Sequence, residues 1–336
     1  MLLGTRPGYA DTAAAGNRES YRRGAVSLPS SRAGQIGIST MLPPDLQNQL
    51  ETGHGLLRSE GAVVAALEEV GDACFMDARV ARLGQDYGHL LKELHAAGII
   101  EQCVELLEFA GVFFVKRKDA KQRLIFDTRR PNCHFEEPSY TELASGESFA
   151  GLEAAAGQPI HLASGDVEVC FYQYSLPEAL RPYFGLKPIR DHMLPKSLAN
   201  KLDRSLMVGG RAFFRVRVVP MGWSWSVFFV QTAHTFQMRS VRPEDPWLID
   251  KRPCSCVEAH NTSKVLYIDN FAALSGSRQM ADDTVHHMKR QLEEKGVRSD
   301  IEDDPTDLLG FSLDARRGWW RPTGKKFWRI HGCLTT

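Results

Sequence analysis

Two short apolar segments of this chain each carry one aspartate, and they decide the predicted fold. Val265–Leu274 has the sequence VLYIDNFAAL, and Ile160–Phe171 has the sequence IHLASGDVEVCF. The first pattern, with apolar runs on both sides of Asp269 and Asn270, predicts a strand, a turn and a second strand. The second pattern predicts a strand that carries Asp166.

A carboxylate in such an apolar strand is costly unless it meets a cation. Asp166 and Asp269 would repel each other if their strands were neighbours, and a shared divalent metal with oxygen ligands is the usual remedy. An aspartate in a β-turn often only accepts hydrogen bonds from its own backbone. This alternative stays open for Asp269.

A third informative segment is Gly111–Asp127, where two β-rich runs flank the polar turn KRKD. This pattern predicts a β-hairpin. Between Gly111 and Asn132 there are seven basic residues and two acidic ones, a local net charge of +5. The hairpin is therefore a strongly basic element.

The other elements follow from periodicity and from Gly and Pro positions. Helices are expected over much of 44–109, including a short one over 101–109, and over 176–183, 223–238 and 282–295. Strands are expected over 212–219 and 308–313, and a polar surface loop over 240–262. Residues 1–40 are rich in Ala, Gly, Ser, Arg and Pro and are expected to be a disordered leader.

The composition is that of an ordinary globular protein. The chain has 336 residues, 43% of them hydrophobic, which excludes a wholly disordered, collagen-like or disulfide-dense chain. Seven scattered cysteines and the lack of a signal peptide indicate an intracellular protein of the cytoplasm or nucleus. Organelle targeting is the weaker alternative, and no apolar run has membrane length.

The net charge of zero, from 41 basic and 41 acidic residues, conceals an uneven distribution. Residues 314–331 carry six basic residues and one acidic one, whereas 282–307 carries nine acidic and four basic ones. Neutrality therefore does not exclude a nucleic-acid partner.

Five blocks of the sequence together resemble the successive motifs of reverse transcriptases of the retroviral and long-terminal-repeat retrotransposon type. In chain order they are GVFFVKRKDAKQRLIFDTRRPN (111–132), DVEVCFYQ (166–173), VVPMGWSWSVFFVQ (218–231), YIDN (267–270) and LLGFSLD (308–314). The resemblance covers roughly residues 90–314. It is specific because all five blocks coincide in order and spacing.

The resemblance implies an α+β fold like the right hand of these enzymes, with fingers, a palm sheet of antiparallel strands backed by helices, and little thumb. The implied divisions are a leader over 1–40, an N-terminal helical region over 41–110, fingers over 111–165, a palm over 166–310, and a primer-grip-like hairpin with the thumb start over 311–336.

The resemblance also assigns catalytic roles in the palm. Asp166 and Asp269 match the metal-binding aspartates, and Val167 matches the residue whose carbonyl also binds metal. Asn270 stands where the family usually has a second aspartate, so it offers an amide oxygen but no charge. Mg²⁺ is the implied metal, with Mn²⁺ as a substitute.

Further residues match the family's nucleotide-binding positions. Lys116, Lys118 and Arg123 correspond to the basic fingers residues that contact a triphosphate; a solvated hairpin tip is the alternative. Phe171 corresponds to the aromatic that excludes a ribose 2′-hydroxyl, with core packing as its alternative. Met221 and Gly222 lie in the block that supports the template and nucleotide, where Gly222 allows close backbone approach.

The implied function is DNA synthesis by an RNA-directed DNA polymerase, with an RNA or DNA template, a primer and a dNTP as partners. The competing hypothesis is an inactive or domesticated remnant of a retrotransposon that at most binds nucleic acid. Asn270 and the short C-terminal region favour it. A separate hypothesis, zinc binding by Cys254, Cys256 and His260, lacks an evident fourth ligand.

Overall fold

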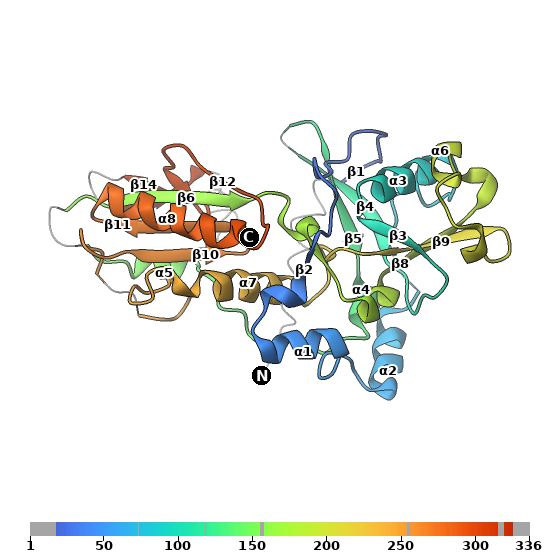
Figure 1. Ribbon diagram of the computed structural model, residues 1–336, viewed down its shortest axis with the longest axis horizontal. Coiled ribbons are helices and arrows are strands. Elements are labelled where there is room, and N and C mark those ends of the chain that lie inside the picture. Colours follow the sequence, from blue (N-terminus) through green and yellow to red (C-terminus); the bar gives the residue numbers. More distant parts are fainter. Residues whose placement is uncertain are drawn as a thin grey trace, which may run out of the picture. The chain divides into compact units, whose positions relative to one another are not determined.

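The computed structural model describes residues 18–72, 74–117, 119–154, 158–253, 256–314 and 319–324 (Figure 1). The chain divides into two compact units, both built from distant parts of the sequence. Unit 1 contains the described residues up to Ser139 together with Phe171–Phe228, and unit 2 contains Tyr140–Cys170 together with the described residues from Phe229 onward. Both units mix helices with antiparallel sheets, as expected for an α+β protein.

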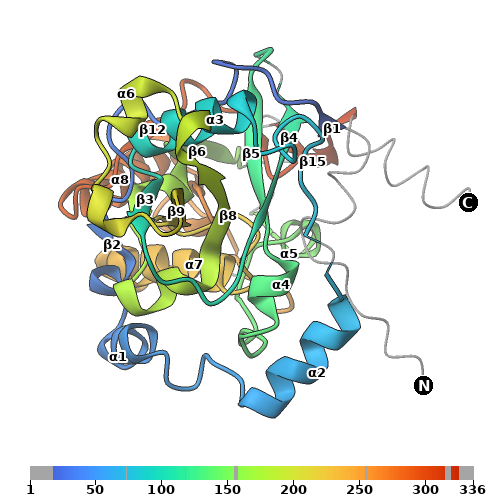
Figure 2. The same cartoon turned by 90° about the vertical axis from the view of Figure 1, so that its right-hand side faces the viewer.

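Unit 1 has two three-stranded sheets and one strand pair. The first sheet has the order β1-β4-β5, the second has the order β3-β9-β8, and β2 pairs in parallel with β7. Helix α3 (Gln85–Ala96) packs against β3, whereas helix α2 (Glu60–Val70) packs against the short helix α4 (Arg129–Asn132), as Figure 2 shows. The strands are β1 (Arg18–Glu19), β2 (Ile36–Gly37), β3 (Ile100–Cys103), β4 (Gly111–Lys116), β5 (Gln122–Asp127), β7 (Tyr174–Ser175), β8 (Gly185–Arg190) and β9 (Arg211–Val216).

Unit 1 contains short α-helices and several 3₁₀ helices. The α-helices are α1 (Pro44–Thr52), α2 (Glu60–Val70), α3 (Gln85–Ala96), α4 (Arg129–Asn132) and α6 (Lys196–Ala199). The 3₁₀ helices include η2 (Ile38–Met41), η4 (Glu178–Phe184), η5 (Asp191–Met193) and η6 (Arg204–Leu206).

The predicted basic hairpin is present as β4 and β5, whose register pairs Gly111 with Asp127 and Lys116 with Gln122. The expected disordered leader is wrong for its second half. From Arg18 onward the chain is packed: Arg18 pairs with Val115 through β1, and the Tyr21 side chain is fully buried. The apolar side chains of this segment are scattered among polar residues, so composition alone gave a misleading signal.

The predicted short helix over 101–109 is also wrong. Ile100–Cys103 forms strand β3, which pairs with β9 in a register of Ile100 with Val216 and Cys103 with Phe213. Pairing with a strand more than a hundred residues away buries both ends of β3, and this outweighs the local helical pattern. Similarly, the helix expected over 176–183 is the 3₁₀ helix η4, which contains Pro182.

Arg215 of β9 and Arg217, which follows β9 directly, are held by internal partners. Arg215 donates from Nε to Glu101 Oε1 at 2.7 Å, an ion pair across the β3–β9 ladder. Arg217 donates from Nη2 to the Ala33 carbonyl at 2.5 Å and from Nε to the Gly98 carbonyl at 3.2 Å. These two guanidinium groups therefore stabilise unit 1.

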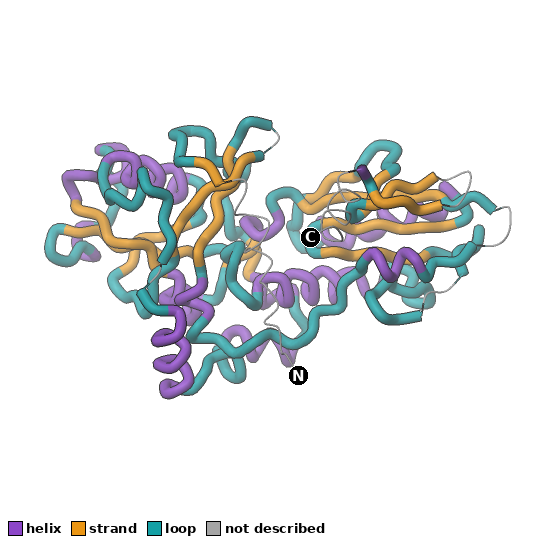
Figure 3. The backbone as a smooth tube through the Cα atoms, turned by 180° about the vertical axis from the view of Figure 1, so that it is seen from behind, coloured by secondary structure: helices purple, strands orange, loops and turns teal. Residues whose placement is uncertain are grey.

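Unit 2 is built on a four-stranded antiparallel sheet of order β10-β11-β6-β12 (Figure 3). The helix α8 packs against β6, β11 and β12 through an apolar stripe that includes Val285, Met288 and Leu292. The elements are β6 (His161–Val167), β10 (Ser263–Tyr267), β11 (Asn270–Ser275), β12 (Ser299–Ile301), α5 (Gly146–Ala150), α7 (Ser226–Gln237), α8 (Arg278–Glu293) and η7 (Met238–Ser240).

A second sheet of unit 2 has the order β13-β14-β15 and contributes Leu308 and Leu313 to the core. Leu162, Val265 and Leu274 of the larger sheet belong to the same buried cluster. The strands are β13 (Asp307–Leu308), β14 (Phe311–Asp314) and β15 (Trp319–Pro322). The predicted strand over 308–313 is thus interrupted by a two-residue turn, Leu309–Gly310, between two short strands.

Candidate active site

The strand, turn and strand predicted around Asp269 are β10 and β11. Their register pairs Tyr267 with Asn270, so Ile268 and Asp269 form a two-residue turn. Ile268 has a φ of +59°, a left-handed conformation that a β-branched residue rarely adopts. The turn that carries Asp269 is therefore strained.

Strand β6 brings Asp166 beside this turn. In the β6–β11 ladder Asp166 pairs with Asn270, and in the β6–β12 ladder it pairs with Asp300. Directly opposed residues of an antiparallel sheet project from the same face. The Val167 amide donates to the Asp269 carbonyl at 2.8 Å, which ties the turn to the end of β6.

Asp166 lies in an environment that opposes its negative charge. Burial is the largest cause of a rise in the pKa of Asp166 to about 7. The carboxylate of Asp269 is the next cause, followed by Glu302 and Asp300. The two aspartates that the sequence singled out are therefore close enough to repel each other, and the site is short of positive charge.

The thiol of Cys170 responds to the same two carboxylates. Burial raises its pKa well above the ordinary value, and the charges of Asp269 and Asp166 add to this rise. β6 itself ends earlier than predicted, at Val167, because Val169 takes a φ of +38° and the chain turns into the 3₁₀ helix η3 (Cys170–Gln173).

Asn270 interacts directly with its neighbour in the turn. Its Nδ2 donates to Asp269 Oδ1 at 2.9 Å. This hydrogen bond orients the Asp269 carboxylate. An aspartate at position 270 would have no proton to donate at neutral pH.

Two side chains of helix α7 hold the turn in place. The Ile268 amide donates to Gln231 Oε1 at 2.8 Å, and Gln231 Nε2 donates to the Leu266 carbonyl at 3.2 Å. His234 Nδ1 lies 2.7 Å from the Ile268 carbonyl. Sequence reasoning gave Gln231 only as the end of a motif and missed His234; several other residues of α7 are polar as well, so no signal in the sequence singled out His234.

Gly165 is required by the packing beside Asp166. A Cβ atom at this position would lie only 2.7 Å from Phe271 Cε2 and from the Asp300 carbonyl oxygen. Phe271 pairs with Gly165 and is fully buried, so its ring covers the glycine. The sheet can hold Asp166 in register only because no side chain stands at position 165.

The predicted nucleotide-binding residues belong to unit 1. Lys116 and Arg123 are exposed on the β4–β5 hairpin, whereas Lys118 lies outside the described residues. Arg123 is near enough to Tyr172 to lower its pKa, although burial outweighs this and leaves that pKa at about 12. Phe171 is half-buried in η3, so its ring is not enclosed in the core.

Met221 and Gly222 lie in a loop that packs on the end of β5. Gly222 has a φ of +125°, and a Cβ there would lie 2.6 Å from the Phe126 carbonyl. Asn132 bridges the same loop, since its Nδ2 donates to the Gly222 carbonyl at 3.2 Å. The close approach that Gly222 allows is thus to the protein's own backbone; Met221 beside it is half-buried.

The ion pair at the base of the hairpin is well formed. Arg129 donates to Asp127 through Nε at 2.9 Å and Nη2 at 2.6 Å, and the Phe75 amide donates to the same carboxylate at 2.7 Å. Burial would raise the pKa of Asp127, but these hydrogen bonds outweigh it and lower the pKa. The hairpin is therefore anchored at its base, the end away from the turn.

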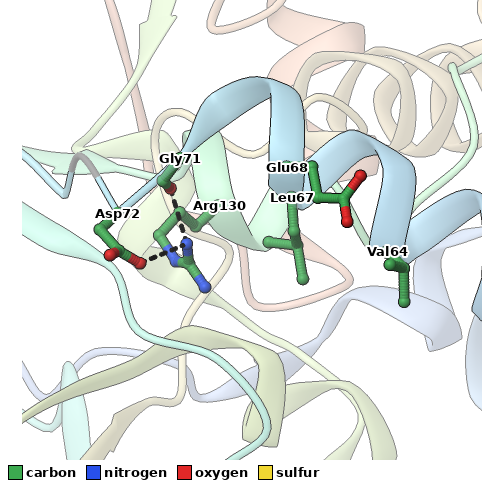
Figure 4. Close-up of a pocket in the computed structure, with 6 residues that line it drawn as sticks. All are labelled: Val64, Leu67, Glu68, Gly71, Asp72 and Arg130. Carbon is green, nitrogen blue, oxygen red and sulfur yellow. Dashed lines mark hydrogen bonds and ion pairs between the residues drawn. The ribbon is translucent and has the colours of Figure 1, made fainter.

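A surface depression beside α2 measures about 380 Å³ (Figure 4). Arg130 points into it, but its guanidinium is already engaged, donating to the Gly71 carbonyl at 2.7 Å and to Glu108 at 3.0 Å. None of the predicted site residues that the structure describes lines this depression. Its lining consists of Val64, Leu67, Glu68, Gly71, Asp72 and Arg130.

The described residues provide neither a ready-made metal cluster nor a membrane span. Within the described parts of the chain, no group of three or more His, Cys, Asp or Glu side chains is arranged to hold a metal ion. Cys254 lies outside the described residues, and His260 pairs with Glu258 at 3.1 Å, so the zinc hypothesis gains no support. Among the described helices, none is both long and apolar enough to cross a bilayer.

Comparisons with known proteins give no family assignment. No model of a protein family matches the chain, and no curated protein matches it. The similarity to reverse transcriptases therefore rests on the five sequence blocks and stays a prediction.

Proposed function

We propose that the chain performs template-directed DNA synthesis, transferring a nucleotide from a dNTP to a primer 3′-hydroxyl. One observation carries the proposal. Asp166 and Asp269, which come from distant parts of the sequence, meet at adjacent strand ends, where burial and the charge of Asp269 raise the pKa of Asp166 to about 7. Such perturbed carboxyl pairs are concentrated at functional sites.

The donor atoms at this site suit a magnesium ion. Asp166 and Asp269 offer carboxylate oxygens, and the Val167 carbonyl is the third proposed ligand. Mg²⁺ often binds through one or two carboxylates while substrate phosphates complete its coordination. When bound, the metal would lower the cost of charge on the attacking and leaving oxygens. Mn²⁺ accepts the same ligands.

The other proposed roles fall to unit 1. Lys116 and Arg123 would bind the triphosphate, because both are exposed and positively charged on an anchored hairpin. Phe171, being half-buried, has a ring surface that could contact the sugar and exclude a 2′-hydroxyl. Met221 and Gly222 would support the nucleotide from a loop whose conformation is fixed by Phe126 and Asn132.

A second candidate function is nucleic-acid binding without catalysis. The observation that favours it is Asn270, which places an amide where a further carboxylate would face Asp166. The site then has one carboxylate on β6 and one in the turn. It has one negative charge fewer for holding two metal ions than a site with an aspartate at position 270. A basic hairpin alone is sufficient for backbone binding.

Extension of a labelled DNA primer on an RNA template, with Mg²⁺ and the full chain, distinguishes the two functions. The polymerase proposal expects extended product from the natural chain and none from Asp166→Ala, with equal primer–template binding by both. Asp283→Ala, which removes an exposed carboxylate on α8, is the matched control and should extend normally. Binding without any extension would support the second function and overturn the first.

A further inference from the structure

The Ile268–Asp269 turn is held in place by bonds to three of its backbone groups. Gln231 Oε1 accepts from the Ile268 amide at 2.8 Å, His234 Nδ1 lies 2.7 Å from the Ile268 carbonyl, and the Val167 amide donates to the Asp269 carbonyl at 2.8 Å. The strained residue Ile268 is therefore held by α7 at both its amide and its carbonyl.

The carbonyl partner of His234 decides the direction of its hydrogen bond and, for a neutral ring, its tautomer. The side chain is fully buried, and this burial lowers its pKa to about 4, so the imidazole is neutral near pH 7. A carbonyl oxygen can only accept, so Nδ1 must carry the proton of the neutral ring. His234 is thus a fixed donor aimed at the turn.

The strain at Ile268 gives this donor its importance. A β-branched residue at a φ of +59° returns to an extended conformation unless its surroundings oppose the change. Rotation of this peptide would move the Ile268 carbonyl away from His234 and re-aim Asp269. Gln231 is itself fixed, because its Nε2 donates to the carbonyls of Leu266 and Glu142 at 3.2 and 3.1 Å.

We infer that His234 is a positioning residue: its Nδ1–H donor keeps the turn in the conformation that holds Asp269 beside Asp166. The inference about the turn depends on geometry alone; its consequence for catalysis rests on the proposed function. His234 contacts the carbonyl of Ile268, the residue that precedes Asp269, so it acts on the carboxylate through this peptide.

Two substitutions separate donor loss from loss of volume. His234→Leu fills similar space without a donor, whereas His234→Asn places an amide nitrogen near the position of Nδ1. His286→Leu is the matched control, since His286 Nδ1 also contacts a backbone carbonyl, that of Asp282 at 2.8 Å, but on the exposed side of α8.

Nitrogen-15 NMR of the imidazole and hydrogen exchange of individual amides provide tests that need no activity. We expect the Nδ1–H tautomer in the natural chain. In His234→Leu, exchange at the Ile268 and Val167 amides should accelerate about tenfold, the effect of one lost buried hydrogen bond. The Ala273 amide, within β11, should not change. His234→Asn and His286→Leu should resemble the natural chain.

Several results would overturn the inference: an Nε2–H tautomer, unchanged exchange at Ile268, or equal acceleration at Ala273, which would indicate a merely structural role. If primer extension occurs, His234→Leu should lower kcat with little change in the KM for dNTP, and His234→Asn should restore it. Expected exchange results without any extension by the natural chain would reject the proposed function and support the inference about the turn.

Discussion

Replacing Asp166 with Asn should make the protein more stable at pH 8 in the absence of divalent metal. Burial of the Asp166 carboxyl and the charges of neighbouring carboxylates raise its pKa from 3.8 to about 7. One pKa unit corresponds to about 1.36 kcal/mol, so this shift corresponds to about 4 kcal/mol. Asp166 is half-buried, and solvent screening reduces the expected gain to about 2 kcal/mol.

The sign follows from proton binding. Between pH 3.8 and about pH 7 the folded protein binds a proton at Asp166 that the unfolded chain has lost. The stability of the natural protein therefore falls as the pH rises through this window. The asparagine of the variant does not titrate, so the stability difference should be near zero at pH 4 and complete above pH 7. Burial lowers the pKa of His234, so the contribution of His234 to stability rises with pH. This contribution is the same in both proteins and cancels from the stability difference.

Urea unfolding of the full chain in EDTA, at pH 4.5, 6 and 8, measures this difference. Asp283→Asn, on the exposed side of α8, is the control and should show no pH-dependent gain. Added Mg²⁺ should stabilise the natural protein at pH 8 but not Asp166→Asn, because binding to the folded state raises its stability. Equal stability of the two proteins at pH 8, or a difference independent of pH, would refute the reasoning.

Three further predictions test other parts of the structure. Gly165→Ala should destabilise the protein by about 1–3 kcal/mol in urea unfolding, because its Cβ would lie 2.7 Å from Phe271 Cε2; a neutral result would show that the ring can move. Phe171→Ala should increase ribonucleotide incorporation in primer extension, and unchanged selectivity would assign the ring to packing alone. Glu108 is buried, yet hydrogen bonds from groups including Arg130 lower its pKa to about 2, so Glu108→Gln should cost about 2 kcal/mol at pH 7. That cost should vanish as the pH falls toward 2, and a cost independent of pH would contradict the assignment.

The sequence predicted those features that depend on local pattern. The β4–β5 hairpin has alternating apolar residues and a polar turn within one short stretch, and its pairing is as expected. The turn at Ile268–Asp269 was predicted for the same reason. The adjacency of Asp166 and Asp269 was implied only by the resemblance to reverse transcriptases, because the two segments by themselves left a simple turn role open for Asp269.

The features that were missed depend on partners far away in the chain. Strand β3 is recognisable only with β9, and the segment after Arg18 only with β4. His234 contacts a carbonyl 34 residues away, and nothing in its own helix indicates that contact. A buried polar side chain must have a partner. The sequence does not show which one.

The arrangement around Asn270 bears on both proposed functions. Asn270 lies directly opposite Asp166 in the β6–β11 ladder, and the pKa of Asp166 is already about 7 because of burial and nearby carboxylates. A carboxylate at position 270 would add another negative charge there and would lose the hydrogen bond that Asn270 donates to Asp269. Asn270 therefore lowers the repulsion in the site while it keeps Asp269 oriented. With less repulsion between its carboxylates, the site depends less on a bound cation for the protein to fold. It can still offer two carboxylates to one metal ion. The stability of the protein should therefore be measured with and without Mg²⁺, separately from primer extension. Stabilisation by Mg²⁺ indicates a metal-binding site, whereas no response indicates two carboxylates that the fold tolerates without a metal.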